Sequence, residues 1–130
     1  MPKLPGLSRG EMEVARVIWE LGDASLGEIF AAFSRAHEGD YSTVQTYVRR
    51  LEAKGYVRSR RDGRSKRYRP KVAPSQVIRQ TLADLTNRLF GGETMPLVRH
   101  LIEDQGISRH DIAELRDLLK RLEEKGHDKP

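Results

Sequence analysis

The spacing of apolar residues changes twice along this chain of 130 residues, and the order of the patterns constrains its fold more than any other feature. Up to residue 54, apolar side chains recur every three or four positions, as on one face of an α-helix. Two strand-like runs follow at residues 56–60 and 66–69, and the segment that joins them contains Asp62-Gly63, a strong hairpin signal. Helical spacing returns after Ser75. The order therefore predicts a β-hairpin between two groups of helices.

Capping boxes predict three helices before the hairpin. In such a box a hydroxyl and a side chain three residues later satisfy free backbone amides at the start of a helix. Boxes begin at Ser8, Ser25 and Ser42, and each is followed by an amphipathic stretch that ends near a glycine. Three helices followed by a hairpin are typical of a winged helix-turn-helix domain, which we expect over residues 1–71.

Three leucine-rich helical patterns follow the hairpin, and a fourth capping box, from Ser108 to Asp111, opens the last of them. Three short helices bury little surface alone, so we expect residues 72–130 to form a dimerisation domain that packs against a second copy. The predicted fold is mainly α with a small β-hairpin: a winged helix-turn-helix domain followed by a three-helix dimerisation domain. The residues expected in the dimer interface are Leu82, Leu85, Leu89, Leu101, Ile112, Leu115, Leu118, Leu119 and Leu122.

Positive charge is concentrated around the predicted hairpin. Eleven of the 23 residues from position 49 to 71 are Lys or Arg and two are acids, whereas the formal net charge of the whole chain is +5. Such a concentration suits a surface that follows a phosphate backbone. We therefore expect double-stranded DNA as the partner.

The third predicted helix carries hydroxyl, amide and guanidinium side chains away from its apolar side. These side chains can reach base edges and phosphates when a helix lies in the major groove. An ordinary solvated helix face would look similar, but the basic hairpin that follows favours DNA recognition. Tyr47 could support the core or lie beside a sugar. The candidates for DNA contact are Ser42, Thr43, Gln45, Thr46, Arg49 and Arg50 in the helix, and Arg61, Arg64, Lys66 and Arg67 in the hairpin.

The composition excludes several kinds of site. The chain has no cysteine, which excludes disulfides, thiolate metal sites and cysteine nucleophiles. Its four histidines lack metal-ligand spacing, and no phosphate-binding loop or Ser/His/Asp arrangement is present, so we expect neither a metal, a cofactor nor an active site. No apolar run is long enough to span a bilayer and no signal-like stretch follows the first residues, so we expect a cytoplasmic protein without membrane insertion.

Several motifs resemble the BlaI/MecI family of penicillinase repressors, whose cousins include the copper-responsive CopY repressors. They are Leu7-Ser8, Glu11-Met12-Glu13-Val14, Val17-Ile18-Trp19, Tyr41-Ser42-Thr43-Val44-Gln45-Thr46, Arg50-Leu51, Lys54-Gly55, and Gly63-Arg64 before Tyr68. The resemblance spans about residues 7–122 and implies a homodimeric bacterial repressor on a pseudo-palindromic operator. It also implies that bases are read by Thr43 and Thr46, with Ser42 where relatives often have a basic residue.

The family resemblance also implies a way in which the repressor is released. In the β-lactam branch a membrane sensor leads to cleavage within the dimerisation domain, and the similar segment here is residues 99–102. The candidate cleavage site is therefore between His100 and Leu101, and a sensor-activated protease would be a partner. The copper branch binds metal through C-terminal cysteines, which this chain lacks. Two alternatives remain: a winged-helix regulator released by a small ligand, and a basic module that binds an acidic protein.

Overall fold

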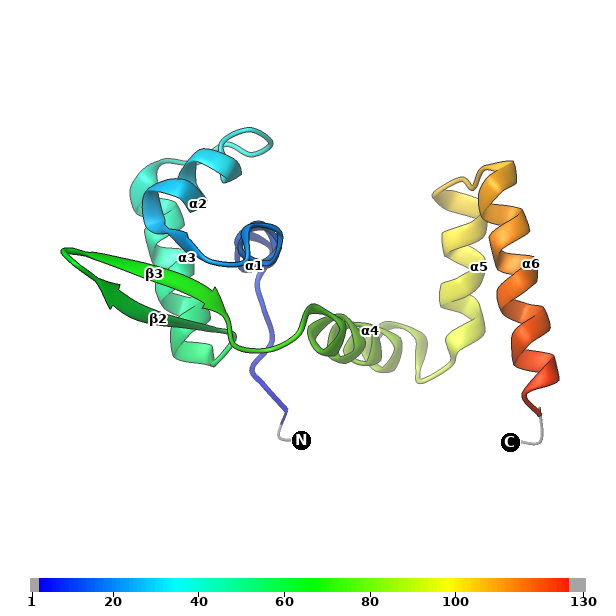
Figure 1. Ribbon diagram of the computed structural model, residues 1–130. Helices are drawn as coiled ribbons and strands as arrows, with labels where there is room; N and C mark the ends of the chain where they lie inside the picture. The colour runs from blue at the N-terminus through cyan, green and yellow to red at the C-terminus, as the bar shows by residue number, and fades with distance from the viewer. Residues whose placement is uncertain (1–2, 127–130) are drawn as a thin grey trace. The chain divides into compact units, whose positions relative to one another are not determined.

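The computed structural model describes residues 3–126, which form two compact units that divide after Leu82 (Figure 1). Helix α4 (Pro74–Phe90) contains the point of division. The boundary predicted after residue 71 was drawn between a DNA-binding region and a dimerisation region. It stays a prediction. None of the helices formed by residues 3–126 is both long enough and apolar enough to cross a membrane.

The first unit begins with α1 (Arg9–Leu21), α2 (Leu26–Phe33) and α3 (Tyr41–Lys54). The capping boxes predicted at Ser8 and Ser25 are both present. The box predicted at Ser42 is wrong, because the N-cap of α3 is Asp40, whose carboxylate accepts a hydrogen bond from the backbone amide of Thr43 at 2.9 Å. This bond lowers the pKa of Asp40. A carboxylate is favoured at this position because the N-terminal end of a helix carries partial positive charge.

The predicted hairpin is formed by β2 (Val57–Asp62) and β3 (Ser65–Pro70), which pair antiparallel. The strands are longer than predicted: Asp62 pairs with Ser65, so only Gly63 and Arg64 form the loop. Gly63 has φ of +66°, a left-handed conformation that two-residue hairpin loops require. Strand β1 (Ala24–Ser25) pairs with β3 and completes a sheet in the order β1-β3-β2. Two residues are too few for β1 to produce an alternating sequence pattern.

The core of the first unit lies between its three helices, the base of the hairpin and the start of α4. The side chains that form it are Val14, Ala15, Val17, Ile18, Ala24, Ile29, Phe33, Val44, Val48, Leu51, Tyr56, Val57, Tyr68 and Val77. The first half of α4 belongs to this unit, because Val77 is buried in the core and the Gln80 side chain exchanges two hydrogen bonds with the backbone of Leu4. Pro74 is the first residue of α4, where its missing amide costs no helical hydrogen bond.

The second unit contains the end of α4 with α5 (Thr94–Asp104) and α6 (Arg109–Glu124), which confirms the three predicted helical patterns. The capping box at Ser108 is present. No residue of α5 or α6 is buried. Of the residues predicted in the dimer interface, Leu85 and Leu115 are half-buried. The exposed ones are Leu82, Leu89, Leu101, Ile112, Leu118, Leu119 and Leu122.

Candidate nucleic-acid interface

Helix α3 packs against the core through one apolar side, and its polar sides are available to contact DNA. Val44, Val48 and Leu51 are buried in the core and set the rotation of the helix about its axis. Among the helix residues predicted to contact DNA, Thr43 and Gln45 are half-buried. Those that are exposed are Ser42, Thr46, Arg49 and Arg50. The structure therefore puts these side chains on the sides of α3 that the sequence predicted, while contact with DNA stays a prediction.

The hydroxyl groups at the start of α3 already donate hydrogen bonds within the protein. Ser42 Oγ and Thr43 Oγ1 donate to the Asp40 carboxylate at 3.0 and 2.8 Å, and Thr46 Oγ1 donates to the Ser42 carbonyl oxygen at 2.9 Å. A hydroxyl has one donor and two acceptor lone pairs. In this arrangement the three hydroxyls offer acceptors to a base, and the threonines also offer methyl groups.

Tyr47 supports the core, which is one of the two roles that the sequence left open. Its ring is half-buried beside the core and lies against Gly10 in the first turn of α1. A Cβ atom added at Gly10 would be only 2.2 Å from Tyr47 Cζ, so a larger residue there would displace the ring. Gly10 was not singled out by the sequence, because its importance depends on a residue 37 positions away.

A second contact joins the first turn of α1 to the last turn of α3. Glu11 is 2% exposed, and its Oε1 accepts a hydrogen bond of 2.6 Å from Lys54 Nζ, which also donates to the Gly6 carbonyl at 2.8 Å. Burial acts to raise the pKa of Glu11, but the hydrogen bonds from Lys54 and Ser8 outweigh it and lower the pKa. Lys54 is two helical turns from Tyr47, so α1 holds α3 at two separate points.

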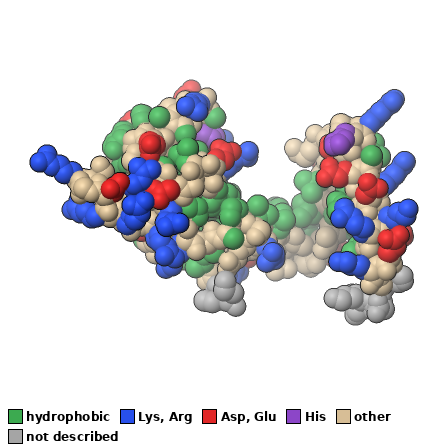
Figure 2. Space-filling model, in the orientation of Figure 1, with side chains coloured by type: hydrophobic (Ala, Val, Ile, Leu, Met, Phe, Trp, Pro, Cys, Tyr) green, Lys and Arg blue, Asp and Glu red, His purple; other side chains and the backbone are tan. Residues whose placement is uncertain are grey.

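The tip of the β2–β3 hairpin carries exposed cations. Arg61, Arg64 and Lys66 are all exposed, as predicted for phosphate contact. Arg61 and Lys66 are cross-strand partners, and Arg64 lies in the loop between the strands. Figure 2 shows blue Lys and Arg side chains on the part of the surface that the hairpin occupies in Figure 1. The tip of the hairpin therefore presents a cluster of exposed positive charge.

Arg67 differs from the other three predicted hairpin contacts, because its guanidinium is bound within the protein. Its Nε donates to Asp23 Oδ1 at 2.7 Å, and its Nη2 donates to the Asp23 carbonyl at 3.1 Å and to Glu28 Oε1 at 3.3 Å. Arg60 Nη2 donates to the other carboxylate oxygen of Asp23 at 3.0 Å. These bonds, led by the one from Arg67, lower the pKa of Asp23. Asp23 is 44 residues from Arg67, so no local pattern pointed to it.

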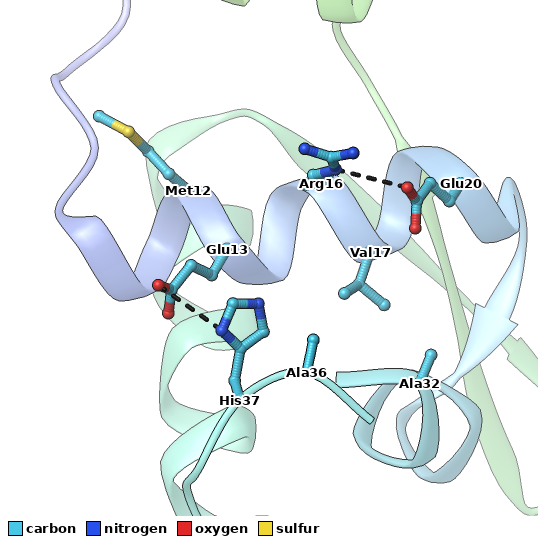
Figure 3. Close-up of a pocket in the computed structure, with 8 residues that line it drawn as sticks. All are labelled: Met12, Glu13, Arg16, Val17, Glu20, Ala32, Ala36 and His37. Atoms are coloured by element: carbon cyan, nitrogen blue, oxygen red, sulfur yellow. Dashed lines mark hydrogen bonds and ion pairs between the residues drawn. The ribbon is translucent and has the colours of Figure 1, made fainter. Parts of the chain in front are cut away.

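A groove of about 480 Å³ lies between α1 and the end of α2, apart from the residues predicted to contact DNA (Figure 3). Two polar contacts line it: the carboxylate of Glu13 lies 3.7 Å from Nδ1 of His37, and Arg16 forms an ion pair with Glu20 at 3.4 Å. Apolar side chains complete the lining, namely Met12, Val17, Ala32 and Ala36. None of the predicted DNA contacts lines this groove.

Comparisons with known proteins agree on one family. The family model described as penicillinase repressor matches residues 7–126. The penicillinase repressor of Bacillus licheniformis is 30% identical over 120 residues, which cover 92% of this chain and 94% of that protein. The methicillin resistance regulatory protein MecI of Staphylococcus aureus (strain N315) is 27% identical over 115 residues, covering 88% of this chain and 94% of that protein.

Two solved structures resemble the first part of the chain. The solution structure of the DNA-binding domain of the repressor BlaI is 32% identical, with a TM-score of 0.52, and covers 58% of this chain and 92% of that domain. The monomeric form of Bacillus licheniformis BlaI, solved in complex with the blaP half-operator, is also 32% identical, with a TM-score of 0.51 and the same coverage. The likeness confirms the predicted winged-helix fold.

Proposed function

Since this chain belongs to the penicillinase repressor family and is a transcriptional repressor rather than an enzyme, we propose that it represses by binding operator DNA through α3 and the β2–β3 hairpin. One observation carries the proposal: the exposed cations of the hairpin tip and the polar sides of α3 belong to the same compact unit. The BlaI structure bound to a half-operator supports it, because that protein shares the fold and 32% of the aligned residues.

In this proposal the helix reads sequence and the hairpin supplies affinity. Helix α3 lies in the major groove, where the hydroxyls of Thr43 and Thr46 accept hydrogen bonds from base amino groups or their methyl groups contact thymine. Arg61, Arg64 and Lys66 contact phosphates beside the groove. The bound protein blocks a promoter, and it acts in the cytoplasm, where a bacterial chromosome is found.

We further propose that the repressor is a homodimer joined through its second unit. Helices α5 and α6 bury none of their own residues and expose large apolar side chains, which a second copy would cover. The groove of about 380 Å³ between α5 and α6 is a suitable place for a helix of the partner. Its lining is mostly apolar: Val98, Leu101, Ile102, Ile107, Asp111, Glu114, Leu115 and Leu118. A two-fold dimer would match a pseudo-palindromic operator with half-sites about one helical turn apart.

Release of the repressor is proposed to follow cleavage between His100 and Leu101 by a sensor-activated protease. Both residues are exposed on α5, and His100 Nδ1 lies 2.6 Å from Asp104 Oδ2 one turn further along. Because α5 has no buried residue, little packing within the chain opposes its local unwinding for cleavage. Intact-mass analysis of the protein from induced cells should give two fragments that meet at this bond. Full-length protein that shifts its melting temperature with a small ligand would instead support release by that ligand.

The test of DNA binding is a titration with selected and random duplexes across salt concentrations. If each protomer neutralises about four phosphates, the logarithm of affinity should fall against the logarithm of salt with a slope of about −7 for the dimer. Selection from genomic fragments should yield one discrete promoter sequence that withstands competitor DNA. A slope near zero, or equal binding to all fragments, would contradict the proposal and favour a basic module for an acidic protein.

Variants separate the two parts of the interface. Thr46→Ala should weaken binding to the selected site by roughly 1 to 3 kcal/mol and leave binding to random DNA unchanged. Arg64→Ala should weaken both, because a phosphate contact carries no sequence information. Arg35→Ala, which removes the same charge from an exposed position after α2, is the control. If Thr46→Ala and Arg64→Ala lost the same affinity on all sequences, α3 would not be the element that recognises the DNA sequence.

A further inference from the structure

We propose that Asp23 limits the affinity of the repressor for DNA: its carboxylate binds Arg60 and Arg67 and thereby keeps two cations of the hairpin from the phosphates of DNA of any sequence. The inference rests on the proposed function, since it concerns how many phosphates the same interface neutralises. Such a limit matters because a genome offers a repressor a large excess of competing sites, to which it binds through phosphates.

The strand register brings the three side chains together on one face of the sheet. Arg60 and Arg67 are cross-strand partners in the β2–β3 hairpin, so their side chains lie next to each other and their charges repel. On the other edge of β3, Ser25 of β1 pairs with Arg67. Asp23 immediately precedes β1, and its carboxylate contacts both guanidinium groups. A single carboxylate between the two guanidinium groups relieves their repulsion.

Each oxygen of Asp23 is used in this contact. Oδ1 accepts from Arg67 Nε at 2.7 Å, Oδ2 accepts from Arg60 Nη2 at 3.0 Å, and the backbone carbonyl of Asp23 accepts from Arg67 Nη2 at 3.1 Å. Glu28 adds an ion pair of 3.3 Å to Arg67 and is itself held by the backbone amide of Ser25. A guanidinium with this many partners must give up charge-assisted hydrogen bonds before it can bind a phosphate.

The hairpin carries seven cations: Arg58 and Arg69 form an exposed cross-strand pair near its base, and the other five fall into two sets. Arg60 and Arg67 are bound to carboxylates, whereas Arg61, Arg64 and Lys66 form no ion pair with any residue between 3 and 126. Arg61 and Lys66 are the next cross-strand pair and lie on the opposite face from the bound pair. Binding to random DNA depends almost entirely on the number of phosphates neutralised. Of these two sets, only the second should therefore contribute fully to that number in the wild-type protein.

The direct test is Asp23→Asn in the full-length dimer, measured by fluorescence anisotropy with the selected operator and with a random duplex of equal length. The variant should bind random DNA roughly tenfold more tightly at 0.1 M salt, and its salt slope should become steeper by up to about 2 per protomer. Affinity for the operator should rise by a similar factor, because phosphate contacts carry no sequence information. Glu20→Gln is the matched control, because it removes the same charge from an exposed ion pair on α1 and should change neither the salt slope nor the affinity.

A second pair of variants keeps the inference testable if Asp23→Asn disturbs the fold. Arg60→Ala should leave the salt slope on random DNA nearly unchanged, whereas Arg61→Ala should reduce it by about 1 per protomer. Combining Arg60→Ala with Asp23→Asn should remove about half of the added slope. Equal slopes for Asp23→Asn and the wild type, or equal losses for Arg60→Ala and Arg61→Ala, would overturn the inference. Failure of the proposed function would look different, because the wild type itself would then select no sequence.

Discussion

The two compact units carry the same kind of amphipathic helix but differ in what covers the apolar side. All the buried apolar residues of the described chain lie at or before Val77, in the first unit. In the second unit, Leu89 is 72% exposed, Leu122 is 66% exposed, and α5 and α6 bury nothing. Periodicity in a sequence therefore identifies which side of a helix is apolar, but not whether the same chain or another one covers it.

This difference predicts two kinds of stability. The first unit has its own core, so its free energy of unfolding should not depend on protein concentration. In the proposed homodimer the second unit is stabilised by burial between copies, so its stability should increase with concentration. The variants below test this separation, beginning with the one expected to have the largest effect.

Leu119→Asp should abolish the dimer. The change would cost about 5 kcal/mol or more, because each dimer would take two unpaired carboxylates out of water. Light scattering during gel filtration should give a monomer, and the first unit should keep its melting temperature. Lys120→Asp introduces a carboxylate on the polar side of α6 and is the control. A dimer that survives Leu119→Asp would exclude this face as the interface.

Phe33→Ala should destabilise the first unit by about 3 to 5 kcal/mol, because it leaves a cavity where a fully buried ring was. Leu122→Ala is its counterpart in the second unit, where it should weaken the dimer and leave the unfolding of the first unit unchanged. Denaturant titrations at two protein concentrations separate the two effects. If Phe33→Ala shifted the dimer dissociation constant, the units would not be independent.

Glu11→Gln should destabilise the first unit by about 2 kcal/mol at pH 7, since it breaks a buried ion pair with the partly exposed Lys54. The pKa of Glu11 is lowered in the folded state, so the stability that its charge contributes is present above the ordinary value of 4.5 and is lost as the pH falls through the lowered value.

The difference in unfolding free energy between Glu11→Gln and the wild type should therefore shrink below pH 4.5. Glu20→Gln, in an exposed ion pair, should change stability by less than about 0.5 kcal/mol at any pH. A loss for Glu11→Gln that stays constant from pH 7 to pH 3 would show that the charge of Glu11 is not what holds α1 to α3.

Ser8→Ala and Ser108→Ala remove equivalent capping hydroxyls, one in each unit, and should each cost about 1 kcal/mol. Ser8→Ala should lower the midpoint temperature of the unfolding transition that does not depend on protein concentration. Ser108→Ala should lower the midpoint temperature of the transition that does. Thermal unfolding followed by circular dichroism at several concentrations distinguishes the two. The comparison between the units would fail if both variants lowered the same transition.

Local signals in the sequence predicted most of the fold. The boxes at Ser8, Ser25 and Ser108 mark helix starts because both partners of a cap lie within four residues of each other. The predicted cap of α3, Ser42, lies two residues after the observed cap, Asp40, and both residue types are favoured at an N-cap, so residue type alone did not identify the right one. The hairpin was predicted from its turn and the two strand-like runs beside it, but the length of its strands depends on pairing that the turn residues alone do not fix.

The parts of the candidate site that the sequence missed depend on contacts between distant residues. The bond from Arg67 to Asp23 spans 44 positions, and the bond from Lys54 to Glu11 spans 43. A charge count treats Arg67 as equal to Arg64, whereas the structure binds one to carboxylates and leaves the other exposed in the hairpin loop. The composition therefore predicted which segment is basic. Only the strand register showed which of its cations are bound to carboxylates and which are not.

The most direct test of the contrast between the two units is sedimentation equilibrium of the full-length chain at micromolar concentrations. If the exposed leucines of the second unit are covered by a second copy, the measured mass should be twice the 14.9 kDa of one chain. A mass of 14.9 kDa at every concentration, with the second unit still folded, would contradict the account.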